Sequence, residues 1–160
     1  MKTGFTLIEV LVVVLIIGIL TSIALPQYQK AVLKTRYMQA MLLGKEIWQA
    51  QQLYKLANDT YANHFEDLDI TMPPTESVRP STEGDSSEYY FYPWGFCWIS
   101  DQSYNACLIY ISASERAWYL AYLSPSETHE CWAEPTTSAT ANALCKSLTQ
   151  KTSTNGHYPF

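Results

Sequence analysis

One ionisable residue, Glu9, stands inside an apolar run that extends from Phe5 to Leu25. The run has 21 residues, and as a helix it would be roughly 30 Å long, about the hydrocarbon thickness of a bilayer. A carboxylate in such a span costs on the order of 3 kcal/mol on insertion scales. Ionisable residues in membrane segments generally serve a function and have a partner, so the sequence predicts that Glu9 meets an opposite charge.

The opposite charge is suggested by the residues that precede the run, Met-Lys-Thr-Gly. Proteolysis after Gly4 would leave a free α-amine on Phe5, four residues before Glu9. That ammonium could pair with the carboxylate in its own helix or in a neighbouring subunit, because charges about 4 Å apart attract strongly in surroundings of low dielectric. Buried polar groups are best known for setting the register of packed helices, so we expect Glu9 to align identical helices.

The segment Gly4-Phe5-Thr6-Leu7-Ile8-Glu9, followed by the apolar run, resembles the N-terminus of type IV pilin precursors. The resemblance implies that a prepilin peptidase cuts between Gly4 and Phe5 and methylates the new N-terminal Phe5. It also implies that Glu9, in a motif that includes Thr6, aligns the subunit in the growing filament.

The resemblance extends over about residues 4–30. Gly18 and Pro26 fall where pilins carry helix-loosening residues. Thr3 departs from the pattern, because the family usually has Lys or Arg before the Gly, and Lys2 is therefore the only basic side chain of the leader.

Two plainer interpretations compete with the pilin resemblance. An ordinary secretory signal peptide would be cut near Ser22-Ile23-Ala24, but the apolar run is longer than usual and Glu9 interrupts its start. A single-span membrane anchor explains the apolar length but leaves Glu9 and the Gly4–Phe5 junction unexplained. The sequence therefore favours the pilin-type segment.

The sequence predicts four parts: a leader of residues 1–4, a transmembrane or filament-core helix of residues 5–25, an amphipathic helix of residues 26–57 and a globular head of residues 58–160. Pro26 should kink the helix without ending it, because the helical pattern resumes beyond it. The helix is expected to end at Asn58-Asp59. Its apolar stripe predicts the surface on which a sheet packs: Leu33, Tyr37, Ala40, Met41, Ile47, Trp48 and Tyr54.

The head is predicted to begin with an irregular connector, residues 58–87, with a short turn at His64–Leu68. Three runs rich in aromatic and β-branched residues predict an antiparallel meander: Glu88–Ile99, Asn105–Ser112 and Ala117–Leu123. A short helix is expected at Ser138–Leu148. The predicted fold class is α+β, a long N-terminal helix packed on an antiparallel sheet with a disulfide-closed C-terminal loop, which the pilin resemblance also implies.

All four cysteines, Cys97, Cys107, Cys131 and Cys145, lie in the head. An even number in an exported chain indicates two disulfides. Three pairings are possible. We favour Cys97–Cys107, across the first hairpin, together with Cys131–Cys145, which would tether the C-terminal helix to the sheet. The zinc alternative is weak because the sequence has no CxxC motif.

Charge is unevenly distributed along the chain. Residues 28–57 contain five basic residues and one acidic residue, whereas beyond residue 57 four basic residues oppose thirteen acidic ones. The acidic head argues against a nucleic-acid partner, which needs a basic stripe. The basic helix could meet lipid head groups or the acidic heads of neighbouring subunits, or it could simply be solvated.

The sequence contains no P-loop, GxSxG or HExxH motif, so we expect no enzyme, no cofactor and no metal ion. His64, His129 and His157 are expected to be surface residues without partners. A half-buried strand with alternating faces explains the aromatic cluster more simply than a stacking or carbohydrate platform: Tyr89, Tyr90, Phe91, Tyr92, Trp94, Phe96 and Trp98.

These features predict a structural subunit of a type IV pilus, made as a single-pass inner-membrane precursor and assembled into a filament at the cell surface. The expected partners are the lipid bilayer before assembly, the prepilin peptidase and methyltransferase, the assembly platform in the inner membrane, and sister pilin subunits. The alternatives are a pseudopilin of a type II secretion system and a membrane-tethered binding module. Two disulfides favour the surface pilus, because such cross-links suit an exposed head.

Overall fold

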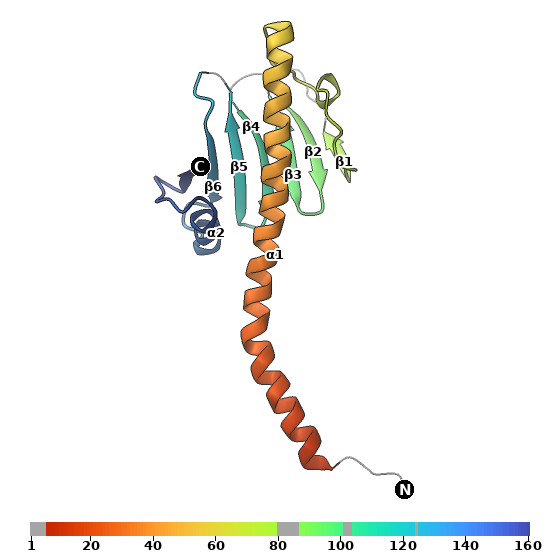
Figure 1. The fold of residues 1–160 in the computed structure, drawn as a ribbon, viewed down its shortest axis with the longest axis vertical. Helices are drawn as coiled ribbons and strands as arrows, with labels where there is room; N and C mark the ends of the chain where they lie inside the picture. The colour runs from red at the N-terminus through yellow and green to blue at the C-terminus, as the bar shows by residue number, and fades with distance from the viewer. Residues whose placement is uncertain (1–5, 80–86, 101–103, 124) are drawn as a thin grey trace. The chain divides into compact units, whose positions relative to one another are not determined.

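The computed structural model describes residues 6–79, 87–100, 104–123 and 125–160. These residues form two compact units, which divide between Lys34 and Thr35. One helix, α1 (Leu7–Asn58), runs through both units without a break (Figure 1). The prediction that the helix continues beyond Pro26 is confirmed, and the kink at Pro26 stays a prediction.

The helix ends where the sequence predicts. Asn58 is its last residue, and Asp59 follows in the left-handed region with φ 58°. The Asp59 N–H donates to the Lys55 carbonyl at 2.9 Å. A short polar residue in this conformation is a common way to close a helix, because it satisfies a carbonyl of the last turn.

The second unit is built on a seven-stranded antiparallel sheet in which every strand pairs with its neighbour in sequence. Hydrogen bonds between consecutive strands therefore make a simple meander, as the sequence predicts. The strands are β1 (Ser77–Arg79), β2 (Glu88–Tyr92), β3 (Gly95–Ile99), β4 (Tyr104–Tyr110), β5 (Arg116–Tyr122), β6 (His129–Glu134) and β7 (His157–Pro159).

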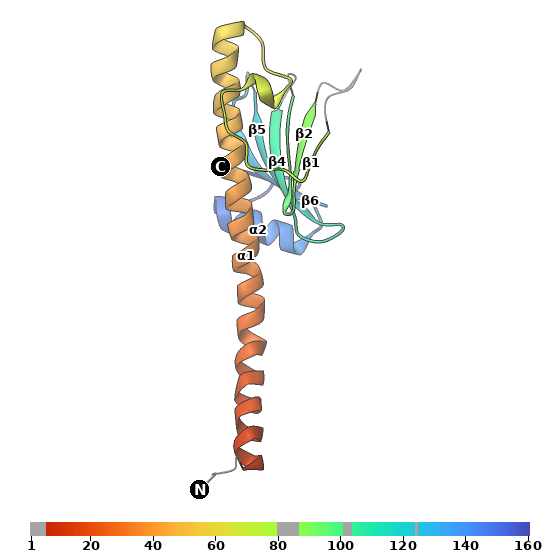
Figure 2. The ribbon, with the colours of Figure 1, turned by 90° about the vertical axis from the view of Figure 1, so that its right-hand side faces the viewer.

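Residues 35–58 of α1 cover one face of this sheet (Figures 1 and 2). The Tyr37 hydroxyl donates to the Trp118 carbonyl at 3.1 Å, and Trp48 Nε1 donates to the Tyr122 carbonyl at 3.0 Å. Between these two bonds, Gly44 allows close approach, because a Cβ there would overlap the ring of Tyr119. The helix is thus fixed to β5 at both ends of its contact by side chains that bond to strand carbonyls.

The apolar stripe predicted for α1 is largely the buried face. Tyr37, Ala40, Met41 and Ile47 are buried, while Leu33, Trp48 and Tyr54 are half-buried. The stripe also contains four buried residues that the sequence analysis did not select: Leu43, Gly44, Ala50 and Gln51.

The C-terminal helix α2 (Ala139–Thr149) lies within one residue of its predicted bounds. The Ser138 hydroxyl caps it by accepting a hydrogen bond from the Ala141 N–H at 3.1 Å, and Gln150 closes it in the left-handed region. Serine is a preferred cap because its oxygen satisfies an otherwise unpaired N–H of the first turn. Its buried residues, Ala141, Leu144 and Cys145, face the sheet.

Two predictions about the strands are wrong. The run Glu88–Ile99 is not one strand but two, β2 and β3, joined by a turn at Pro93-Trp94; proline cannot donate to a ladder and so favours a turn. The connector of residues 58–87 is not irregular throughout, because it contains strand β1. The short turn predicted within it at His64–Leu68 is confirmed, because the 3-10 helix η1 (Phe65–Asp67) lies there. Strands β6 and β7 were not predicted at all.

Candidate functional site

The N-terminus of α1 brings together Thr6 and Glu9. The backbone N–H and the hydroxyl of Thr6 donate to Glu9 Oε2 at 3.0 and 2.8 Å, and the Glu9 N–H donates to Thr6 Oγ1 at 3.4 Å. This reciprocal arrangement is a capping box, T-x-x-E, in which each side chain satisfies a backbone donor of the first helical turn. The T-x-x-E spacing of Thr6 and Glu9 is visible in the sequence, but a capping box was not among the predicted features. Gly4 and Phe5, the predicted cleavage and methylation residues, lie outside the described residues.

The helix that follows is apolar and uncovered within the first unit. Its large apolar side chains from Leu7 to Leu25 are all exposed, for example Leu20 at 62% and Ile23 at 64%. By length and composition alone, α1 is the one helix among the described residues that could cross a membrane. Its two hydroxyl residues bond within the helix, Thr21 Oγ1 to the Ile17 carbonyl and Ser22 Oγ to the Ile19 carbonyl. Glu9 therefore remains the one ionisable side chain between Thr6 and Leu25.

Gly18 lies in the middle of this apolar surface. A Cβ built on Gly18 would meet no atom within 4 Å. Within the chain, nothing in the described residues explains a glycine at this position by close packing. Its predicted role in loosening the helix stays a prediction.

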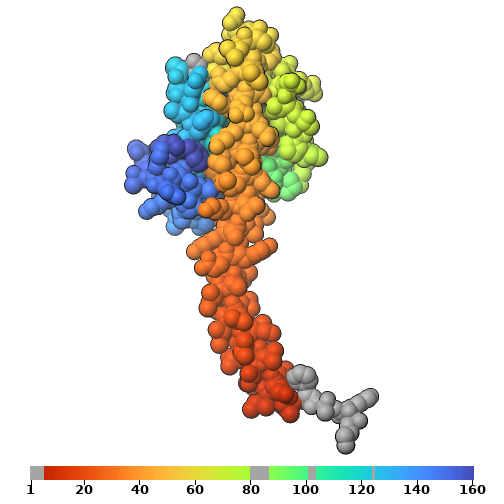
Figure 3. All heavy atoms as spheres, in the orientation of Figure 1, coloured from red at the N-terminus to blue at the C-terminus, as the bar shows by residue number. Residues whose placement is uncertain are grey.

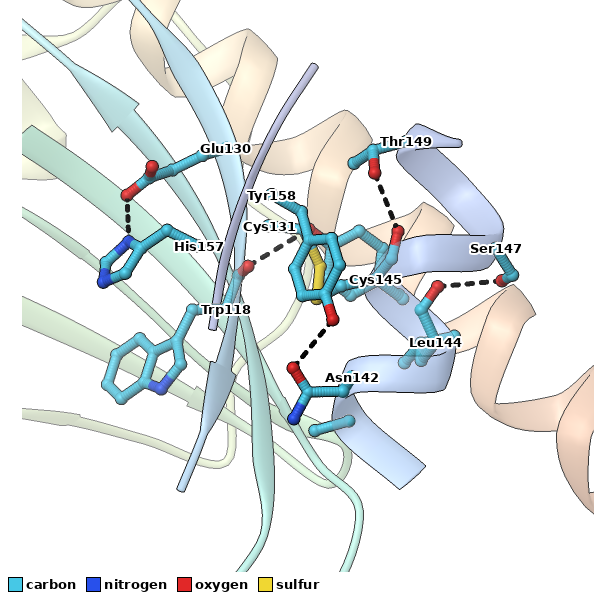
Figure 4. The surroundings of a disulfide bond; sticks show 12 residues. Trp118, Glu130, Cys131, Asn142, Leu144, Cys145, Ser147, Thr149, His157 and Tyr158 are labelled. Atoms are coloured by element: carbon cyan, nitrogen blue, oxygen red, sulfur yellow. Dashed lines mark hydrogen bonds and ion pairs between the residues drawn. A yellow bond between two sulfur atoms is a disulfide. The ribbon is translucent and has the colours of Figure 1, made fainter. Parts of the chain in front are cut away.

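Both disulfides in the structure have the pairing that the sequence analysis favours. Cys97 and Cys107 are directly opposed in the β3–β4 register. Cys131 on β6 bonds to Cys145 on α2 (Figure 4). All four cysteines are fully buried, and both bonds lie on the face of the sheet that α1 and α2 cover, beside Tyr119.

The residues around the Cys131–Cys145 bond fix the end of the chain to the sheet. The Tyr158 hydroxyl donates to Asn142 Oδ1 on α2 at 2.8 Å, and His157 Nδ1 lies 2.7 Å from Glu130 Oε1 on β6 (Figure 4). Strand β7 adds backbone pairing with β6. The C-terminal segment is therefore held by a disulfide, a strand pairing and side-chain bonds at once.

His64 is exposed, as expected, although its Nδ1 lies 3.9 Å from Glu88 Oε1. The expectation of surface residues without partners is wrong for the other two histidines. His157 is half-buried and pairs with Glu130. His129 is also half-buried, with its ring 4.8 Å from the Trp48 ring and its Nδ1 2.7 Å from the Tyr119 hydroxyl. Burial, with a smaller contribution from the charge of Lys45, lowers the pKa of His129 from its ordinary value. His129 therefore belongs to the packing between α1 and the sheet.

Aromatic rings gather on the other face of the sheet. In β3, Cys97 and Ile99 point to the α1 side, while Phe96 and Trp98 alternate with them and are half-buried. Trp98 and Trp118 meet edge to face with centroids 5.1 Å apart. The expectation of alternating faces is confirmed. The cluster extends beyond the predicted run and shields Ala106, Leu108 and Leu120; its rings are Tyr89, Phe91, Phe96, Trp98, Tyr104, Trp118, Tyr122 and Trp132.

Among the described residues, no group of three or more His, Cys, Asp or Glu side chains is placed to hold a metal ion. The arrangement that stands out chemically is instead the N-terminal one. A carboxylate held at the first turn of an apolar helix offers an acceptor for a cationic group, and nothing in the described part of the first unit neutralises it.

Comparisons with known proteins point to the same segment. The family described as the prokaryotic N-terminal methylation motif matches residues 1–25. A type IV major pilin protein of Neisseria gonorrhoeae is 32% identical over 76 residues, covering 48% of this chain and 46% of the relative. A fimbrial protein of Pseudomonas aeruginosa is 48% identical over 60 residues, covering 29% and 39%.

A type II secretion system core protein G of Pseudomonas aeruginosa is 33% identical over 98 residues, covering 59% of this chain and 69% of the relative. The match spans about half the length of the type IV major pilins of Neisseria gonorrhoeae. No solved structure is significantly similar. The chain belongs to the family of type IV pilins and similar proteins.

Proposed function

We propose that this protein is a structural subunit of a type IV pilus. The precursor is inserted in the inner membrane through α1, a prepilin peptidase cuts it between Gly4 and Phe5, and Phe5 is N-methylated. The processed subunit then passes from the bilayer into a filament at the cell surface. No catalytic role is proposed for the chain itself, since the similar proteins carry the names of pilins, fimbrial proteins and secretion-system components.

One observation carries this proposal: Glu9 is the one ionisable group on an otherwise apolar, uncovered helix that follows the methylation motif. In a bilayer, the exposed apolar side chains are solvated by lipid, and in a filament core by sister helices, so the transfer changes their surroundings little. The Glu9 carboxylate differs, because it gains an opposite charge only when a neighbour's Phe5 amine approaches. Its pairing would therefore favour assembly in one register.

A second candidate is the pseudopilin of a type II secretion system. The match to the core protein G of Pseudomonas aeruginosa favours it, because that match covers more of the relative than the match to the pilins does. The same processing and the same role of Glu9 would apply. The filament would then be short and periplasmic.

The role of Glu9 is tested by replacing it. We expect Glu9→Leu to be found in the membrane at the normal level but to be missing from filaments. Thr21→Leu is the matched control, because it replaces another polar residue of the same apolar segment whose hydroxyl is already bonded within the helix. The quantity to measure is the ratio of subunit in sheared filaments to subunit in the membrane. Normal incorporation of Glu9→Leu would refute the proposed role.

A further inference from the structure

A groove lies along one flank of α1, at the edge of its buried face and beside the segment that follows η1. It has a volume of about 390 Å³ and lies between one face of α1, at positions 46, 49, 50, 53, 54 and 57, and the segment that follows η1. Figure 3 shows the outer face of α1 in this unit uncovered between the sheet edges. Such a space is too small for a helix backbone, but it can receive side chains that a neighbouring helix projects.

The groove combines an apolar floor with an acidic rim. Ala50, Tyr54 and Ile70 line the floor, and the carboxylates at its edge are those of Glu46, Asp67 and Asp69. Among the described residues none of these three carboxylates has an ion-pair partner.

Three leucines on the outer face of α1 are exposed, whereas a solvated helix face usually carries polar residues. Leu42 is 57% exposed, Leu53 67% and Leu56 83%. Leu53 lies in the groove itself. Leu53 and Leu56 are three residues apart and are therefore neighbours on the helix surface. Neighbouring exposed apolar side chains beside a polar rim are typical of a surface that another molecule covers.

The chain also contains a segment of complementary character. Lys30 and Lys34 lie one turn apart on α1, and both are exposed. No described residue forms an ion pair with either of them. Residues i and i+4 share one face of a helix, so the two ammonium groups can act together.

We propose that the acidic groove receives the Lys30–Lys34 segment of a second copy of this chain. The inference rests on the proposed assembly into a filament and names the residues that join neighbouring subunits outside the apolar core. The occupant is a second copy because its exposed lysines complement the charge of the acidic rim.

Photo-cross-linking tests the contact directly. A benzoylphenylalanine replaces Leu53 in the full chain, and filaments are irradiated in native cells. We expect adducts of two chains in which position 53 is bound to the segment around residues 30–36 of the second chain. The control position is Val78 on β1, which is exposed but lies outside the groove. If filaments form normally but position 53 is cross-linked only to other segments, the proposed contact is wrong and the proposed filament assembly still stands. If the protein is absent from filaments, the proposed function itself is contradicted.

Charge exchange supplies the second test. We expect the double change Lys30→Glu with Lys34→Glu to lower the amount of filament protein about fivefold at an equal membrane level, and the further changes Asp67→Lys with Asp69→Lys to restore it to within about twofold. Lys151→Glu and Glu76→Lys, exposed and outside the groove, are the matched controls. Failure of the exchanged charges to restore assembly would contradict the proposal.

Discussion

The two stretches of α1 show how differently one helix can meet its surroundings. From Leu7 to Leu25 every large apolar side chain is exposed within the chain, whereas between Tyr37 and Gln51 the apolar face is buried against β5 and its neighbours. The second stretch packs on the sheet of its own unit, and its side chains donate hydrogen bonds to strand carbonyls. Both disulfides lie on the same face of that sheet. No other described element of the first unit covers the first stretch.

The difference in burial indicates which surroundings each stretch of α1 requires. An apolar helix surface of this size is stable in lipid or against other apolar helices. The stretch on the sheet has a packed core and bonds that only the folded head provides. We therefore expect that substitutions in the head change its free energy of unfolding, while substitutions in the apolar stretch change membrane insertion or assembly.

The largest effect on the head is expected from Gly95→Ala. A Cβ at Gly95 would overlap the backbone carbonyl of Leu108 on the paired strand, and the ladder cannot shift without breaking its hydrogen bonds. We predict that the free energy of unfolding falls by more than about 3 kcal/mol. The measurement is a urea titration of the full chain in detergent micelles, followed by tryptophan fluorescence, since all five tryptophans lie in residues 35–160. Hydrogen exchange in residues 7–34 should stay unchanged; if it changes equally, the two units are not independent in stability.

Removal of the Cys131–Cys145 bond is expected to have the next largest effect. The bond closes a loop with a sequence separation of 14 residues, so its loss in the double change Cys131→Ser with Cys145→Ser should cost about 3 kcal/mol by the chain-entropy estimate. The same urea titration measures it, with Cys97–Cys107 intact in both proteins. A loss below about 1 kcal/mol would mean that β7 and the side-chain bonds hold the C-terminus without the disulfide.

Two glycine substitutions, one in each stretch of α1, compare the packing of the two stretches directly. Gly44→Ala would push a Cβ into the ring of Tyr119, which is fully buried and cannot swing away, so we expect a loss of about 2 kcal/mol in the head. Gly18→Ala meets open space and should leave the unfolding of the head unchanged. Equal effects of the two changes on the urea midpoint would contradict the contrast drawn between the two stretches.

The smallest effect is a pH dependence that arises at His129. Because burial lowers the pKa of His129 below its ordinary value of 6.5, the unfolded chain binds more protons than the folded one just below that pH. The contribution of His129 to stability is therefore fully present above its ordinary pKa and is lost as the pH falls below that value. The His129→Gln variant should show a weaker decrease over this window in urea titrations. A decrease of the same size in both proteins would assign the effect to other groups.

Much of the fold follows from local patterns that the sequence displays. The apolar run and the resumed helical period beyond Pro26 predict α1, and the turn chemistry at Asn58-Asp59 predicts its end. The pairing Cys97–Cys107 was predicted from the position of the two residues across the first hairpin, and the structure has them opposed in register. These features depend on neighbouring residues, and for that reason the sequence contains the information.

The remaining features depend on tertiary contacts. Strand β6 contains Glu130 and Glu134, and these charged residues weaken the apolar pattern by which a strand is predicted from sequence. The segment forms a strand because it pairs with β5 and β7. Gln51 is fully buried although polar, since its side-chain amide exchanges two hydrogen bonds of 2.8 Å with the backbone of Ala62. At the N-terminus, the Thr6–Glu9 capping box had a sequence signal, whereas the groove between α1 and residues 67–70 had none.

Processing after Gly4 and assembly into a surface filament can be tested together by intact and N-terminal peptide mass spectrometry of filaments sheared from native cells. We expect a chain that begins at N-methylated Phe5 and has all four cysteines oxidised. A chain that begins at Leu25, or a processed chain that stays in the membrane and is absent from sheared filaments, would contradict this expectation.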